Sequence, residues 1–209
     1  MGPGTMKVAQ NTKRTVPSLD VQSIRDISER AFWDGLEILA VIQLLEIGNQ
    51  RRVQESLNKS STRFAADIIK RALVVHLTFL ITRAYGGKQV CPGDCDARAV
   101  FEQLKRNPAI AKGMHDPTDL AEAQRLWNKC WGDQRRKRIV DYRDKYVAHY
   151  GEPQSAPPQY RELCGFARAT ASALEKLAHG TGEVRVSHES QLQARNASAE
   201  KFWDFLARG

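Results

Sequence analysis

Residues 20–49 read DVQSIRDISERAFWDGLEILAVIQLLEIGN, and this stretch decides the fold class. Its apolar side chains recur mostly at steps of three and four residues, which places them on one face of an α-helix. Ser18 or Asp20 is the expected N-cap, because a side-chain oxygen there accepts a hydrogen bond from the first turn. Gly48-Asn49 suits the end of the helix. The face consists of Val21, Ile24, Ile27, Phe32, Leu36, Leu39, Ile42 and Leu45.

The remainder of the chain repeats the helical spacing and shows no hairpin pattern. In residues 64–85 apolar side chains crowd most sides, so we expect this helix to be the central and most buried one, with His76 as a satisfied core histidine. Further helices are expected from Asp96 to about Lys105, from about Thr118, and over 160–179. The fold class predicted from these elements is an all-α helical bundle.

Composition divides the chain into a bundle and two ends. We expect residues 1–17 to be a flexible arm, because they are rich in Gly, Pro, Asn and Thr without periodicity. Residues 18–180 form the helical bundle domain. Residues 181–209 form a polar tail with an extended piece at 184–186 and a short amphipathic helix at 202–206. The aromatic residues of that helix are expected to dock on this chain or on a partner.

The charge balance indicates what kind of partner the chain binds. Its 209 residues carry a net charge of +8, which favours a polyanion such as nucleic acid. Hydrophobic residues at 42% and charged residues at 27% argue against wholesale disorder. The start of the chain lacks a signal-peptide core, and the longest apolar run, over 72–81, is too short to span a bilayer. We therefore expect a cytoplasmic protein without membrane contact.

The four cysteines do not suggest a disulfide framework or a metal centre. Cys91 and Cys95 bracket a short loop, whereas Cys130 and Cys164 fall on predicted helices. A structural zinc site normally uses two closely spaced ligand pairs, and only one such pair is present. We expect reduced thiols, no metal and no cofactor.

The stretch with the most chemistry is YRDKYVAHY, residues 142–150. It places an arginine, a carboxylate and a histidine within about one and a half helical turns. Arginine clamps phosphate with a planar fork, and histidine moves protons near neutral pH. The basic run 135–138 lies just upstream. These are the groups that a nuclease working without metal requires.

A regular helix does not bring the two principal groups together. His149 is rotated by about 120° from Arg143, whereas Tyr142 and Lys145 share a face with His149. Convergence on one phosphate requires the helix to unwind near Ala148, or two chains to pool their residues. The alternative is an ordinary helix, in which Arg143 makes surface ion pairs and His149 is a helix-terminal cation.

The pattern Arg143-Asp144-Lys145-x-x-Ala148-His149 resembles the signature of the HEPN superfamily, and looks most like its AbiU-type branch, associated with phage abortive infection. The resemblance covers roughly residues 20–180. It implies a bundle with a long antiparallel helix pair. It also implies a metal-independent endoribonuclease in phage defence or a toxin–antitoxin system, with two motifs meeting in the cleft of a homodimer.

The same resemblance implies a role for each residue of the motif. His149 would act as acid or base on RNA, Arg143 would stabilise charge on the phosphate, and Asp144 would orient one of them. One toxin branch has a shorter Arg-to-His spacing and a tyrosine that a partner nucleotidyltransferase modifies. Tyr150 directly follows His149 here, so this regulation is not carried over, although an antitoxin or nucleotidyltransferase remains a candidate partner. The expected RNA-binding residues are Lys145, Arg135, Arg136, Lys137 and Arg138, with Tyr142 and Tyr150 in support.

Two other functions fit part of this pattern. HEPN-like bundles also occur as non-catalytic binding or oligomerisation modules, which would keep the bundle and the basic surface. A DNA-binding regulator is less well supported, because no helix-turn-helix with a short glycine turn precedes the basic run.

Overall fold

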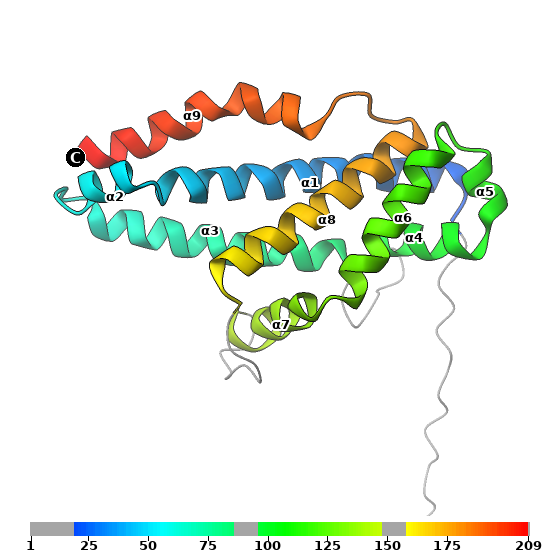
Figure 1. Ribbon diagram of the computed structural model, residues 1–209, viewed down its shortest axis with the longest axis horizontal. Coiled ribbons are helices and arrows are strands. Elements are labelled where there is room, and N and C mark those ends of the chain that lie inside the picture. Colours follow the sequence, from blue (N-terminus) through cyan, green and yellow to red (C-terminus); the bar gives the residue numbers. More distant parts are fainter. Residues whose placement is uncertain (1–18, 86–95, 148–157, 209) are drawn as a thin grey trace, which may run out of the picture.

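The computed structural model describes residues 19–85, 96–147 and 158–208, and every regular element within them is helical (Figure 1). The prediction of an all-α bundle is therefore confirmed. The elements are α1 (Val21–Gly48), α2 (Arg51–Leu57), α3 (Arg63–Ala84), α4 (Ala97–Arg106), α5 (Pro108–Lys112), α6 (Pro117–Gly132), α7 (Gln134–Tyr142), the π-helical turn η1 (Arg143–Val147), α8 (Tyr160–Thr181) and α9 (His188–Arg208).

Aspartate side chains set the start of several helices. Asp20 accepts a hydrogen bond of 2.7 Å from the backbone N–H of Ser23, and Asp96 accepts one of 3.0 Å from Ala99. Asp96 was predicted as a cap, and of the two candidates Ser18 and Asp20 the structure has Asp20 as the N-cap of α1. At the other end of the bundle sequence, Gly182 ends α8 with a φ of 87°, a left-handed conformation that glycine adopts without steric cost.

The centre of the bundle is formed by α1 and α8. α8 crosses α1 in Figure 1, α6 packs on α8, and α9 runs along α1. The side chains at the crossing are fully buried, since Ile24, Ile38, Leu174 and Leu177 expose none of their surface. This packing covers most of the apolar face of residues 20–49, from Ile24 to Leu45, whereas Val21 at its start is exposed.

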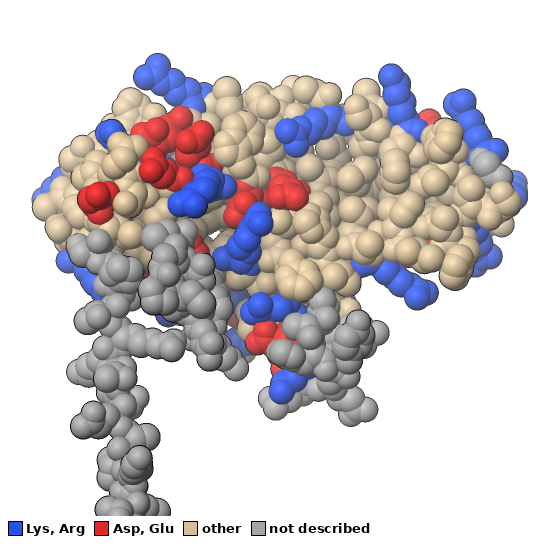
Figure 2. Space-filling view, turned by 180° about the vertical axis from the view of Figure 1, so that it is seen from behind, with Lys and Arg blue, Asp and Glu red and all other residues tan. Residues whose placement is uncertain are grey.

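The prediction that residues 64–85 form the most buried helix is wrong. α3 packs on one side only, and on its outer side Phe64 is 77% exposed and Ile68 51% exposed. His76 is also exposed and lies 2.9 Å from the Glu37 carboxylate, so it is a surface residue rather than a core histidine. Apolar residues on all sides of a helix are typical of a buried helix, but no described element covers the outer side of α3. The back of the molecule is accordingly broad and largely uncharged over its right half in Figure 2.

The C-terminal tail also differs from the expectation. In place of a short helix at 202–206, residues 188–208 form one long helix, α9, which ends beside α2 (Figure 1). Residues 184–186 precede α9 and belong to no regular element. The Trp203 side chain is fully buried, and its indole N–H donates a 2.7 Å hydrogen bond to the carbonyl of Leu44. One of the tail aromatics therefore docks on this chain, whereas Phe205 is 78% exposed. No helix within the described part of the chain is long and apolar enough to cross a bilayer.

Candidate functional site

The predicted motif lies where α7 changes into a π-helix. The π turn comprises Arg143–Val147, so it begins at the motif arginine. π turns are rare and occur frequently at functional sites. The angle of about 120° between Arg143 and His149 assumed a regular α-helix, and that assumption fails from Arg143 onward. Ala148, His149 and Tyr150 lie outside the described residues.

The arginine of the motif contacts the carboxylate beside it. Arg143 Nε lies 2.7 Å from Asp144 Oδ1, and both side chains are about three-quarters buried. The Nε–H does not point at the carboxylate as in a hydrogen bond, so the contact is an ion pair. Asp144 thus holds the guanidinium, as both the ribonuclease interpretation and the ordinary-helix interpretation require.

Two arginines of the upstream run have carboxylate partners within the fold. Arg135 Nη2 donates a 2.6 Å hydrogen bond to Asp133 Oδ2, and the hydrogen bonds from Arg135 lower the pKa of the Asp133 carboxyl. Arg138 donates a 2.8 Å hydrogen bond to Glu162 and lowers the pKa of that group. These pairs fix the start of α7 and join α7 to α8. Lys137 and Lys145 are exposed to solvent.

Arg136 is held differently. Its Nε–H donates a 2.9 Å hydrogen bond to the carbonyl of Trp131, and its guanidinium lies 4.2 Å from the centre of the Trp131 ring. Partial burial lowers the pKa of Arg136. The predicted basic run therefore separates into Arg135 and Arg138 with carboxylate partners, Arg136 on an aromatic ring, and an exposed Lys137.

α7 packs against an aromatic cluster. Trp127 stacks on Tyr85 with ring centres 4.5 Å apart and on Phe101 with ring centres 4.3 Å apart. The Tyr85 hydroxyl is 2.8 Å from the hydroxyl of Thr170, and burial raises the pKa of Tyr85. The sequence did not indicate that Trp127 and Trp131 lie against the motif helix.

The remaining predicted residues do not form a second centre. Tyr142 is half-buried in the last turn of α7. Cys130 and Cys164 are buried free thiols, and burial raises the pKa of each. Cys91 and Cys95 lie outside the described residues. Within the described ranges no three His, Cys, Asp or Glu side chains gather as metal ligands would.

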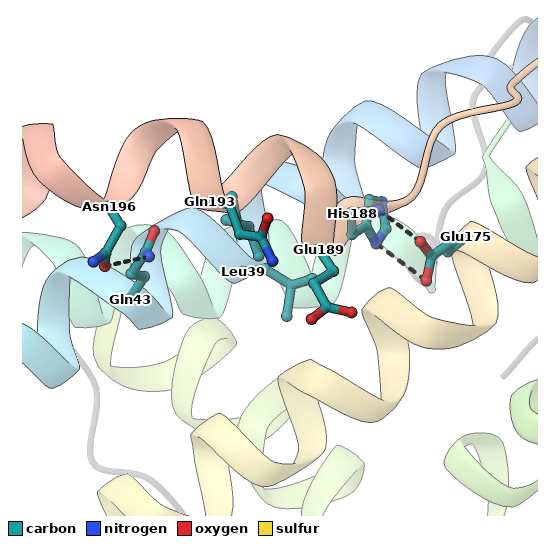
Figure 3. A pocket seen from close by; sticks show the side chains of 8 residues that line it. Leu39, Gln43, Glu175, His188, Glu189, Gln193 and Asn196 are labelled. Atoms are coloured by element: carbon teal, nitrogen blue, oxygen red, sulfur yellow. Dashed lines mark hydrogen bonds and ion pairs between the residues drawn. The ribbon is translucent and has the colours of Figure 1, made fainter.

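A separate groove of about 450 Å³ lies between α1, α8 and α9 (Figure 3). At its end, the Glu175 carboxylate accepts a 2.6 Å hydrogen bond from the backbone N–H of His188. The His188 ring is buried, and its Nε2–H donates 2.9 Å to the carbonyl of Phe32. Gln43 and Asn196 close the opposite end through a 2.8 Å hydrogen bond. Nothing in the sequence singles out His188, because His188 lies in a polar tail that contains no motif.

No protein-family model, curated protein or solved structure significantly matches this chain. The resemblance to HEPN proteins therefore depends on the residues of the motif and on the all-α bundle.

Proposed function

We propose that this chain is a HEPN-type, metal-independent endoribonuclease of the cytoplasm that acts in phage defence or a toxin–antitoxin system. The observation that carries the proposal is the π turn that starts at Arg143, within the Arg-Asp-Lys-x-x-Ala-His pattern. A π turn is a departure from regular helix geometry at the place where the chemistry needs one.

The proposed reaction needs only groups of the motif. His149 of one motif takes the proton from the RNA 2′-hydroxyl, whose oxygen forms a bond to the neighbouring phosphorus. The bond from phosphorus to the 5′-oxygen breaks, and the protonated His149 of the second motif gives that oxygen its proton. Arg143 stabilises the negative charge that grows on the phosphate oxygens. Asp144, with its carboxylate 2.7 Å from Arg143 Nε, holds the guanidinium in place. The homodimer places two such motifs in one cleft.

The second candidate function is a non-catalytic binding or oligomerisation module. It is favoured by the ion pairs of Arg135 and Arg138, which use these cations within the fold, Arg135 at the start of α7 and Arg138 between α7 and α8. The exposed apolar side of α3, with Phe64, Ile68 and Phe79, fits a protein interface better than an RNA surface.

RNA cleavage in excess EDTA separates the two functions. Wild type is compared with Arg143→Ala, His149→Ala and a remote control, Arg125→Ala, whose partner Glu122 lies on the same exposed helix face. The ribonuclease predicts cleavage by wild type and the control, and loss of cleavage in both motif variants at unchanged helical content and oligomer size. Equal cleavage by all four proteins, or none by wild type, would favour the binding module.

A further inference from the structure

Two arginines from different helices share one tryptophan ring. The guanidinium of Arg98, on α4, lies 4.9 Å from the centre of the Trp131 ring, and that of Arg136, on α7, lies 4.2 Å from it. Both arginine side chains are partly buried. Neither forms an ion pair with a carboxylate of the described residues, whereas the neighbouring Arg135 and Arg138 both do.

Two guanidinium groups beside one ring repel each other. Burial lowers the pKa of Arg136, and repulsion from Arg98 adds to the effect. The Trp131 ring offsets part of this cost, because its face attracts cations, but it carries no full negative charge. Burial of charge is costly unless an opposite charge accompanies it. An anion that contacts both guanidinium groups would supply that charge.

Arg136 lies on nearly the same side of the helix as Arg143 of the motif. Arg136 precedes Arg143 by seven residues, so the two are only about 20° apart around the helix and about 10 Å apart along it. A strand of RNA that runs along this side of α7 would pass Arg136 and reach the phosphate at Arg143. The spacing is suited to a phosphodiester backbone, which carries one negative charge per nucleotide.

We propose that Arg98 and Arg136 together bind a backbone phosphate of single-stranded RNA, next to the phosphate that Arg143 contacts. The identity of the polyanion rests on the proposed ribonuclease function. Guanidinium groups bind phosphate through paired N–H donors in a fixed plane, and the ring of Trp131 holds both planes in position.

The test measures binding without cleavage. The full chain is titrated against a fluorescent single-stranded RNA with 2′-O-methyl groups, which lacks the attacking hydroxyl. Arg98→Gln and Arg136→Gln should each weaken binding about tenfold or more. The double variant Arg98→Gln with Arg136→Gln should also reduce the slope of log affinity against log salt by about 0.7, the loss of one phosphate contact. The matched control is Lys105→Gln, which removes an exposed charge from the last turn of α4, the helix that carries Arg98, and should leave the affinity unchanged.

Arg136→Gln also removes the hydrogen bond from Arg136 to the Trp131 carbonyl, so Arg98→Gln and the milder Arg98→Lys decide the outcome. Wild-type affinity in Arg98→Gln, or no binding by wild type, overturns the proposal. The ribonuclease function fails separately: if His149→Ala still cleaves while Arg98→Gln loses binding, the phosphate site stands without the catalytic assignment. If His149→Ala abolishes cleavage while Arg98→Gln binds and cleaves normally, the catalytic assignment stands and the phosphate site fails.

Discussion

Two tryptophans hold opposite parts of this bundle by different means. Trp127 stands in an aromatic stack between Tyr85 and Phe101, and so joins α6 to the end of α3 and to α4. Trp203 joins the tail helix α9 to α1 through one hydrogen bond and a small apolar cluster. The first cluster lies under α7, since Arg136 contacts Trp131 and Tyr85, whereas the second contacts neither α7 nor η1.

The Trp127 stack therefore supports the motif helix α7, whereas Trp203 supports only the tail helix α9. A change at the Trp127 stack should affect both stability and the motif helix. A change at Trp203 should loosen α9 and leave RNA binding intact. Each of the following experiments tests that division.

Trp127→Ala should have the largest effect. It removes a fully packed ring from the main core, and changes of this kind cost about 3–5 kcal/mol of unfolding free energy. Because α7 rests on the same cluster, affinity for RNA should fall in the fraction that stays folded. Urea unfolding measures the first effect and anisotropy the second. Normal RNA affinity in a destabilised Trp127→Ala protein would show that the cluster does not position the site.

Gly48→Ala should act on the tail alone. A Cβ at this position would lie 2.6 Å from the Trp203 ring, so the indole must move. Overpacking costs about 1–3 kcal/mol, and the better helix propensity of alanine returns about 1 kcal/mol of it. Hydrogen exchange should become faster in residues 188–208 while RNA affinity stays unchanged.

Gly132→Ala is the matched control for this substitution, because no atom lies within 4 Å of its added Cβ. It also lies at the end of a helix, α6. Unchanged exchange of α9 in Gly48→Ala would show that Trp203 does not fix the tail helix.

His188 should make stability depend on pH. Burial lowers the pKa of its ring from the ordinary value of 6.5, against the opposing effects of the Phe32 carbonyl and Glu175. The folded chain therefore binds fewer protons than the unfolded one, so this contribution is complete above about pH 6.5 and is lost as the pH falls toward the lower folded pKa. Melting temperatures from about pH 8 to about pH 5 should fall more in wild type than in His188→Gln. Parallel pH profiles would contradict this assignment.

Arg125→Gln should have the smallest effect. Its ion pair with Glu122 lies on the surface of α6, and isolated surface pairs contribute little because water screens them. The melting temperature and RNA affinity should match wild type within error. A clear loss of affinity would extend the RNA surface to the outer face of α6.

Features that depend on neighbouring residues in the sequence were predicted correctly. The spacing within residues 20–49 indicated α1, and the aspartates at 20 and 96 indicated two helix starts, because caps and helical periodicity depend on neighbours within a turn.

Features that depend on distant partners were missed. The helix α3 was expected at the centre because it is apolar on most sides. The expectation failed because the residues of a helix do not reveal which of its sides other helices will cover. The polar sequence of α9 gave little sign of a long helix, since its stability comes from docking Trp203 and Ala199 on other helices. The motif was visible in the sequence, but the pairing of Arg98 with Arg136 was not, because the two stand in separate helices.

By itself, the sequence determined that the chain is helical, where α1 and α4 begin, and which segment carries the nuclease-like residues. These properties follow from interactions between residues within about one turn of a helix. Only the tertiary structure decided which helix is central, that α9 is ordered, which cations of the basic run are already paired, and that the helix widens at Arg143. Those outcomes depend on which surfaces meet, and burial is a property of the whole packed chain.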